Sequence, residues 1–325
     1  MAATPSTSQP RIISPPATAD ILFVSNRDTG SSRTEVYSMD RMGGDLTRIT
    51  YTDEFHFILG MDPTRRFIAA SRAEEDTNSN GELDGEDRRS LWLIDLETKE
   101  ERRLTDPNNH AEGDSFSPDS EWIVFLMMLP DKPGDIYKIR RDGTDLTNLT
   151  NTPTIMEGDP CWSIDGKWIA FNAFDPELQR FVLKKMDPEG GNVQILYDGG
   201  PGVHTTIFPA GNYDPSWSPD NQWLVFERAV AYDGENFGSG IWHIFKVRVD
   251  GTGVLDLSIA GGHVDRAEYL PSFSPDGRFI VFGSIYEADP LTNSHNDIFL
   301  MDDDGGSLLC LTNHSGNDMY PVWIP

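Results

Sequence analysis

The chain has 325 residues, of which 53 are acidic and 26 basic, and its formal net charge is −27. Such a charge repels a phosphate backbone, so we expect no nucleic-acid ligand. Hydrophobic residues make up 38% of the chain, enough for a packed core, which excludes a wholly disordered protein. The length allows one large domain or two domains of ordinary size.

The first 19 residues are rich in Pro, Ser, Thr and Ala and predict a flexible leader. They contain no apolar signal-peptide core, and no apolar run in the chain approaches the roughly 18 residues needed to span a bilayer. Mature exported domains often begin with such a spacer. We therefore expect a periplasmic or extracellular protein, with a cytoplasmic location left open.

One segment recurs along the chain: a short strand, a turn built on Ser-Pro-Asp, and a second strand of apolar β-formers. The copies recur at intervals of about 46 to 56 residues, a period typical of propeller blades. The copies are a degenerate one at 60–70 and full ones at 114–125, 159–171, 214–226 and 271–282.

Each copy continues into a third, alternating strand and a weaker fourth strand that ends on Leu-Thr or Ile-Thr, which makes a four-stranded antiparallel blade. The chain opens with a second strand at 21–25 and closes with a first strand at 318–324. These two fragments complete one blade, so residues 20–325 are predicted to form a single six-bladed β-propeller closed by its two ends. Two β-sandwiches would leave the split repeat unexplained. The other blades are expected near 55–105, 112–150, 157–198, 211–260 and 267–313.

These repeats resemble the TolB-like family of six-bladed propellers, whose WD40-like repeats share the Ser-Pro-Asp-Gly turn and the closing Leu-Thr. The resemblance covers residues 20–325 and implies the architecture. TolB itself also carries an N-terminal α/β domain, for which this sequence has no counterpart, and Gly-x-Ser-x-Gly does not occur. The resemblance therefore implies no particular activity.

An insertion between the second and third strands of the second blade has the pattern of a calcium loop. Gly81 takes the sixth position, where the loop turns sharply, and the backbone carbonyl of Glu82 would ligate at the seventh. Amides at two positions and a short Asp at the last predict weak binding of Ca²⁺, and a solvated turn is the alternative. The candidate ligands are Asp76, Asn78, Asn80, Glu82, Asp84 and Asp87.

Polar residues recur shortly before the turn of each first strand, where they are expected to ring one mouth of the central tunnel. Such a ring would hold a cation or recognise a basic peptide; the alternative is that each residue caps a turn through backbone amides. The candidates are Glu112, Glu157, Asn212, Glu268 and Asp318, with Glu54 close by. The seven histidines show no zinc-site spacing, and Cys161 and Cys310 are expected to be buried free thiols.

We therefore expect a non-catalytic, calcium-binding propeller that serves as a scaffold for a protein, peptide or ligand partner. The alternative is an enzyme, a hydrolase or lyase acting on a carbohydrate or lactone at the tunnel mouth, which would need titratable groups that converge on a pocket. Two more insertions, at 231–240 and 286–295, occupy the same position in their blades as the calcium loop and are expected to share its face.

Overall fold

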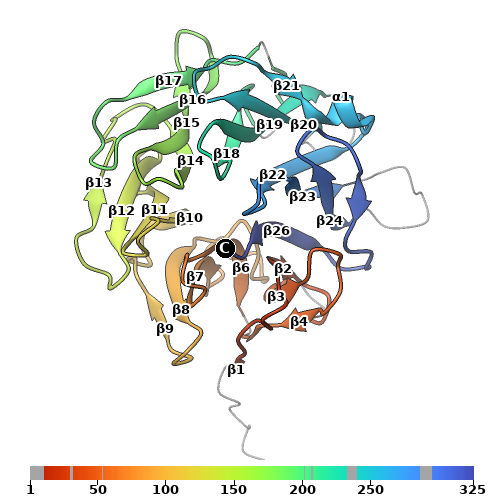
Figure 1. Cartoon of the computed structure of the whole chain (residues 1–325). Helices are drawn as coiled ribbons and strands as arrows, with labels where there is room; N and C mark the ends of the chain where they lie inside the picture. Colours follow the sequence, from red (N-terminus) through yellow and green to blue (C-terminus); the bar gives the residue numbers. More distant parts are fainter. Residues whose placement is uncertain are drawn as a thin grey trace, which may run out of the picture.

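The structure is a computed structural model that describes residues 11–29, 32–52, 54–200, 202–205, 208–232, 240–285 and 295–325. In these ranges the chain forms six four-stranded antiparallel blades arranged around a common axis (Figure 1). A single parallel pair, Trp242 with Ala267, joins the fifth and sixth blades into one continuous sheet. The predicted all-β propeller is thereby confirmed. The insertions at 231–240 and 286–295 lie mostly outside the described residues.

The closing blade is built from both ends of the chain, as predicted. The C-terminal strand β26 (Asp318–Trp323) is innermost and pairs with β2 (Ile21–Ser25), which is followed by β3 (Glu35–Met39) and β4 (Thr47–Arg48). Ile21 lies opposite Trp323, and Ser25 lies opposite Asp318. This pairing leaves neither terminal strand with an open edge at the junction.

The remaining blades follow in chain order, each from its inner to its outer strand. They are β6 to β9 (Phe55–Met61, Phe67–Ala73, Ser90–Asp95, Glu101–Arg103), β10 to β13 (His110–Phe116, Trp122–Met128, Asp135–Arg140, Thr147–Asn148), β14 to β17 (Glu157–Trp162, Ile169–Asp175, Arg180–Met186, Gln194–Tyr197), β18 to β21 (Tyr213–Trp217, Trp223–Ala231, Ile241–Arg248, Leu255–Asp256) and β22 to β25 (Ala267–Phe273, Phe279–Ile285, Asn296–Asp302, Leu309–Cys310). A short helix α1 (Leu257–Gly261) follows β21.

The structure differs from the expected leader at its second half. Strand β1 (Arg11–Ile12) pairs with β5 (Thr50–Tyr51), and the side chain of Ile12 is buried. The hydroxyl of Ser14 donates to the carbonyl of Leu96 at 2.9 Å. Residues 11–19 therefore lie against the first two blades, because Ile12 and Ala19 are buried in the core cluster there and the strand pair and the Ser14 hydroxyl add hydrogen bonds. Residues 1–10 lie outside the described residues.

The Ser-Pro-Asp turn repeats because its serine makes the same two hydrogen bonds each time. The Ser117 hydroxyl donates to Asp119 at 2.5 Å and accepts the amide of Trp122 at 2.9 Å, which ties the turn to the start of the second strand. The same bonds recur at Ser163, Ser218 and Ser274. In the degenerate copy Asp62 takes this role, and its carboxylate accepts the amide of Phe67 at 2.7 Å.

The closing Leu-Thr is also structural. The hydroxyl of Thr312 accepts the amide of Ile298 at 2.9 Å and donates to Asp297 at 3.1 Å, so it joins the end of the fourth strand to the third. Thr150 makes the same pair of contacts in the third blade, with Ile136 and Asp135. Part of the acidity of the chain is therefore explained by carboxylates that serve a repeated bond inside the blades.

Candidate functional site

All six innermost strands have a register shift where they pass the axis of the ring, and four of them place a non-glycine residue there in the left-handed conformation. Asp159 in β14 and Asp214 in β18 both have a φ of 49°, and the strand register shifts at each of them. Leu270 in β22 and Tyr320 in β26 adopt the same left-handed conformation, with φ of 53° and 55°. A proline follows each one. Because non-glycine residues enter this region at a cost and bulges redirect side chains, the fold holds these four residues at the axis by constraint.

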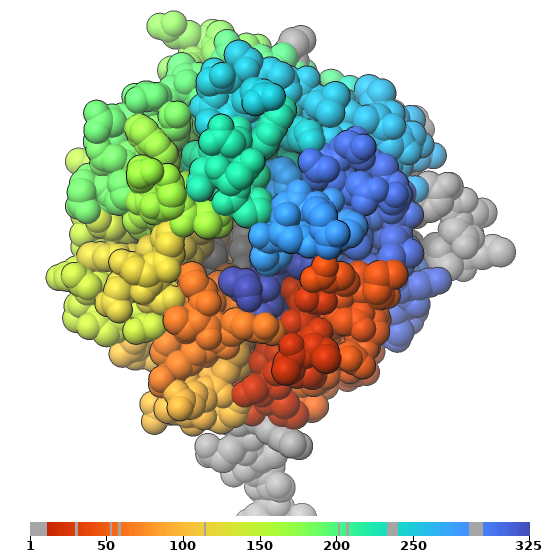
Figure 2. All heavy atoms as spheres, viewed as in Figure 1, coloured from red at the N-terminus to blue at the C-terminus, as the bar shows by residue number. Residues whose placement is uncertain are grey.

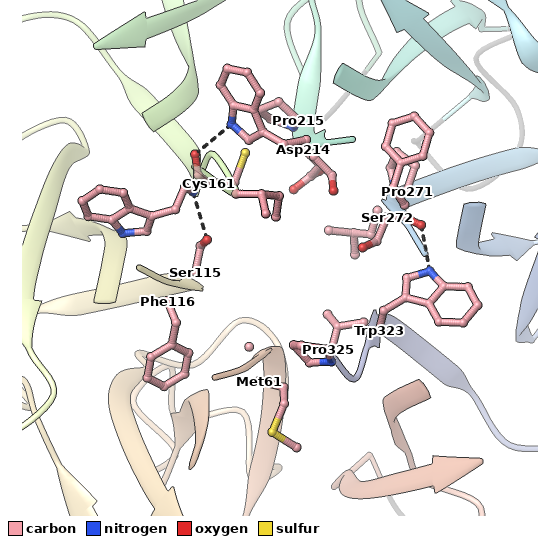
Figure 3. Close-up of a pocket in the computed structure, with 18 of the residues that line it drawn as sticks. Met61, Ser115, Phe116, Cys161, Asp214, Pro215, Pro271, Ser272, Trp323 and Pro325 are labelled. Carbon is pink, nitrogen blue, oxygen red and sulfur yellow. Dashed lines mark hydrogen bonds between the residues drawn. The ribbon is translucent and has the colours of Figure 1, made fainter. Parts of the chain in front are cut away.

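The tunnel contains a cavity of about 600 Å³, within the range of small-molecule sites. It reaches from the four left-handed residues Asp159, Asp214, Leu270 and Tyr320, which we call the redirected residues, to a set of turns. These turns contain Pro118, Pro219 and Pro275, and the wall of the cavity is mostly apolar. Figure 2 shows the central hollow, and Figure 3 shows the lining side chains around it. In five of the six innermost strands the lining residue before the repeated aromatic, or before Met61 in the degenerate copy, is small; these residues are Gly60, Ser115, Cys161, Ser216 and Ser272, while Val322 takes this position in β26.

Hydrogen bonds between neighbouring blades hold this wall (Figure 3). The amide of Trp162 donates to the Ser115 hydroxyl at 3.0 Å, and the indole Nε1 of Trp217 donates to the carbonyl of Cys161 at 3.2 Å. On the opposite side, Nε1 of Trp323 donates to the carbonyl of Ser272 at 3.0 Å. The repeated aromatics therefore belong to the core and also fix the tunnel lining in place.

Three carboxylic acids from two adjacent blades interact here: Asp159 and Asp214 line the cavity, and Glu227 is near enough for its charge to act on Asp214. The amide of Asp214 donates to Oδ2 of Asp159 at 3.2 Å, and the same oxygen accepts the side-chain amide of Asn172. Glu227 lies on β19 opposite Tyr213, and its carboxylate accepts the backbone amide of Leu270 from the next blade. Glu227 is only 7% exposed.

These acids are hard to ionise. Burial raises the pKa of Asp159 to about 6 and that of Glu227 to about 8. Burial also raises the pKa of Asp214 well above its usual value, and the charges of Asp159 and Glu227 raise it further. Because burial and like charges both oppose ionisation, all three carboxyl groups lose their protons at a higher pH than ordinary carboxylates do.

Glu112 lines the same cavity but is ionised. Burial alone would raise its pKa, yet hydrogen bonds and charge interactions with His110 and Arg89 hold it at about 2. The Arg89 guanidinium contacts Oε2 of Glu112 at 2.5 Å, and His110 lies 3.4 Å from the same oxygen. The cavity therefore combines a fixed carboxylate with a group of protonatable ones.

The predicted ring of polar residues at the tunnel mouth is not formed. Only Glu112 of the five lines the cavity. The other four side chains are buried inside or between blades: Glu157, Asn212, Glu268 and Asp318. They point away from the tunnel because they lie on the other side of the bulge, where the strand faces its neighbours in the blade. Glu54 pairs with the buried Arg72 at 2.9 Å, also within its blade.

Each of these buried residues has a structural partner. Glu268 accepts from Ser258 and from Nδ1 of His263, both at 2.5 Å. Asp318 pairs with Arg27 at 2.6 Å, which helps to close the ring. The remaining two are held by backbone or hydroxyl groups: the side-chain amide of Asn212 donates to the Phe181 carbonyl at 3.2 Å, and Thr150 bonds Glu157.

Sequence reasoning missed Asp159, Asp214 and Glu227. The available signal was the dipeptide Asp-Pro, which occurs at the same place in two consecutive copies of the repeat. An aspartate tolerates the left-handed region better than most residues, and the following proline disfavours helix, so the pair marks a bulge. Glu227 carried no comparable signal, because its position in the second strand holds Asn172 or Gly283 in neighbouring blades.

The predicted calcium loop lies on the insertion between β7 and β8. Gly81 has a φ of 92°, and its amide donates to Asp76 at 2.8 Å. Asp87 is fully buried and accepts the amides of Thr77 at 2.6 Å and Asp84 at 3.0 Å. In the described part of the chain no group of three or more His, Cys, Asp or Glu side chains is placed to hold a metal. The donor set nonetheless suits calcium, since three carboxylates, two amide oxygens and a carbonyl lie on one tightly turned loop.

The two cysteines differ from expectation. Cys310 is exposed on the outer strand β25, and Cys161 is half-buried and lines the tunnel. An edge strand at the rim leaves its side chains in solvent, which explains Cys310. Burial raises the pKa of the Cys161 thiol, and the nearby charges of Asp159 and Asp214 raise it further.

The ring of blades and its axial cavity define a TolB-like six-bladed propeller. Among solved structures, TolB from Acinetobacter baumannii superposes with a TM-score of 0.69 and 19% identity over 94% of this chain and 66% of that one. An oligogalacturonate lyase from Vibrio parahaemolyticus superposes with a TM-score of 0.57 and 14% identity over 94% and 77%. At these identities the likeness shows the fold alone.

The curated relatives match this chain over only part of its length. An uncharacterized protein of Agrobacterium fabrum is 28% identical over 148 residues, which cover 42% of this chain and 46% of that protein. An uncharacterized peptidase of Bacillus subtilis is 28% identical over 168 residues, 44% of this chain and 24% of that one. The chain thus spans less than half the length of these relatives. No protein-family model matches the sequence. None of the helices in the described ranges is long and apolar enough to cross a membrane.

Proposed function

We propose that this propeller is a binding scaffold whose tunnel receives a cationic group of a protein or peptide partner. The observation that carries the proposal is the cavity itself, with an apolar wall that leads to Glu112, Asp159 and Asp214. A lysine or arginine side chain matches this shape, because its methylene stem packs on the wall while its charge meets the carboxylates. An approaching cation lowers the raised pKa values of Asp159 and Asp214, so binding and proton release are linked.

Cys161 provides a built-in probe of this charge. In a Cys310→Ser background we would compare the alkylation rates of Cys161 by trimethylammonioethyl and sulfonatoethyl methanethiosulfonate. We expect the cationic reagent to react at least about ten-fold faster, since a confined acidic site concentrates cations. The preference is expected to grow between pH 6 and pH 9 as the acids ionise. The ratio of the two rates cancels the ionisation of the thiol itself.

The matched control is the Cys161→Ser variant, in which the exposed Cys310 reports the charge of the outer surface. Asp159→Asn and Asp214→Asn are expected to reduce the preference at Cys161 and to leave Cys310 unchanged. Equal preferences at the two cysteines would show that the tunnel has no special affinity for cations and would refute the proposal.

We also propose that the loop 76–87 binds Ca²⁺ as a structural ion and that the protein works in a calcium-rich, exported setting. The ligands would be Asp76, Asn78, Asn80, Asp84 and Asp87 with the backbone carbonyl of Glu82. Support comes from the inward-held carboxylates: Gly81 anchors Asp76, and Asp87 is buried against loop amides. Isothermal titration should give a dissociation constant of about 10⁻⁴–10⁻³ M that Asp76→Ala abolishes. Absence of heat at millimolar calcium would end this part of the proposal.

A hydrolase or lyase is the second candidate, because the tunnel brings together a carboxylate whose pKa is lowered and others whose pKa is raised, the division of roles that acid–base catalysis uses. An acidic cavity would repel an anionic sugar, which argues against the oligogalacturonate substrate of the lyase that shares the fold. We would screen neutral aryl glycosides and lactones. If the native protein turns over a substrate and Asp214→Asn does not, the result would support an enzyme. If the native protein and Asp214→Asn give equal turnover, an enzymatic role of the tunnel would be excluded for those substrates.

A further inference from the structure

One guanidinium connects the proposed calcium loop to the tunnel. Arg89 follows the loop directly and is 5% exposed. Its Nη1 donates to the carbonyl of Gly85 inside the loop, and its Nη2 donates to Oε2 of Glu112 at 2.5 Å in the tunnel wall. Its Nε is buried without a hydrogen-bond partner. The side chain therefore binds the loop and the tunnel wall at the same time, and its Nε donor is left without a hydrogen bond.

A second chain of contacts runs beside the first. The guanidinium of Arg89 lies over the ring of Phe57, 4.1 Å from its centroid. The ring of Phe57 in turn packs on Tyr320, with 4.3 Å between the centroids. Tyr320 is one of the four redirected residues and lines the cavity.

We propose that Arg89 couples occupancy of the calcium loop to the charge of the tunnel. The inference rests on the proposed calcium site and extends it to regulation. Calcium fixes the loop and with it the Gly85 carbonyl, which holds the guanidinium on Glu112 and neutralises that carboxylate. Without calcium the loop carboxylates repel one another, the carbonyl moves, and Glu112 loses its counter-ion. Because coupling is reciprocal, a cation that engages Glu112 also weakens calcium binding.

Arg89 is a positioning residue in this scheme, since it contacts neither the calcium nor the bound cation. The expected effect is a fall in the cation preference of Cys161 alkylation when Ca²⁺ is added. Couplings between sites commonly amount to about five-fold or more, so a five-fold fall is the scale we expect. In Glu112→Gln the ratio is expected to be independent of calcium, because the group that Arg89 neutralises is absent.

The experiment measures calcium binding by titration and the two alkylation rates of Cys161, with and without 10 mM Ca²⁺, in the Cys310→Ser protein. Glu112→Gln is the test variant, and Phe57→Leu is a second one that breaks the aromatic route without changing charge. Glu157→Gln is the matched control, because Glu157 lies on the next first strand and does not touch the loop. The control is expected to keep both the calcium affinity and the calcium response.

The outcomes separate the two proposals. Calcium binding with an unchanged ratio of alkylation rates in the otherwise native protein overturns the coupling and leaves the calcium site intact. No detectable calcium binding overturns both. A calcium-dependent ratio that survives in both Glu112→Gln and Phe57→Leu shows that the signal bypasses Arg89 and also overturns the inference. Loss of the response in Glu112→Gln, with retention in Glu157→Gln, supports it.

Discussion

The amide of Asp214 donates to Oδ2 of Asp159 at 3.2 Å, so two acids that are 55 residues apart in the chain lie side by side in the tunnel. They are equivalent residues of consecutive repeats, each at a bulge and each followed by proline. The bond joins the innermost strands of two blades and places one carboxylate next to the backbone of the other. The local repeat thereby generates a tertiary cluster in which burial raises the pKa of both acids and the charge of Asp159 raises that of Asp214 further.

Stability is expected to fall as pH rises above 5. The pKa of Asp159, about 6, and that of Glu227, about 8, lie above the unfolded values near 4. A raised pKa contributes stability that is fully present below the unfolded pKa and is lost as pH passes the folded one. We expect the melting midpoint to be at least about 3 °C lower at pH 8.5 than at pH 6.

Glu227→Gln tests this assignment, because the amide imitates the protonated acid and is expected to flatten the upper part of the pH profile. Glu177→Gln, an exposed carboxylate, is the control and should retain the native slope. Differential scanning calorimetry from pH 5 to pH 9 provides the measurement. A native slope in Glu227→Gln would place the titrating group elsewhere.

The serine of the repeated turn is expected to be worth about 1–2 kcal/mol per blade. Ser218→Ala removes the acceptor of the Trp223 amide and the donor to Asp220, and Ser218 is nearly buried. Urea denaturation would measure the loss. The double variant Ser218→Asp/Asp220→Thr copies the Asp62-Pro-Thr64 turn of the second blade and should recover part of the lost stability. An unchanged stability in Ser218→Ala would show that water replaces the hydroxyl.

Removal of residues 317–325 is expected to abolish cooperative unfolding. This deletion takes away β26, the ion pair of Asp318 with Arg27, and Trp323 from the cluster between the closing and sixth blades. It also exposes the edge of β2, which favours aggregation. Deletion of Pro325 alone, an exposed residue, is the control. Circular-dichroism melts and size-exclusion chromatography would report both; a monomer with a native melt after the longer deletion would contradict the closure.

Calcium is expected to raise the melting midpoint. With a dissociation constant of about 10⁻⁴–10⁻³ M, 10 mM Ca²⁺ stabilises the folded state by about 1.4–2.7 kcal/mol, or roughly 2–6 °C. Asp76→Ala should melt at the same temperature with and without calcium. Magnesium at 10 mM is a further control, since its strict octahedral geometry suits this loop poorly. Equal shifts by both ions would indicate a general ionic effect.

The architecture was readable from the sequence because it is encoded locally and repeatedly. Each Ser-Pro-Asp turn makes its own hydrogen bonds, as at Ser117 and Ser274, and needs no distant residue to form. The split repeat then predicted the pairing of β2 with β26, since an unpaired edge at either end would be unfavourable. The proposed calcium loop is local in the same sense, and its order of oxygen-bearing residues could be listed without a structure.

The tunnel chemistry could not be predicted in this way. The same stretch of first strand that was expected to ring the mouth turns at a bulge, so Glu268 and Asp318 enter the interior of the sheet while Asp159 and Asp214 face the axis. A shift of one residue exchanges the two faces of a strand, and sequence spacing does not reveal a bulge directly. Composition and repeats thus determined the ring of blades by themselves. Only the tertiary structure decided which carboxylates meet at its axis, because their pKa values and the contact of Arg89 with Glu112 depend on distances between separate blades.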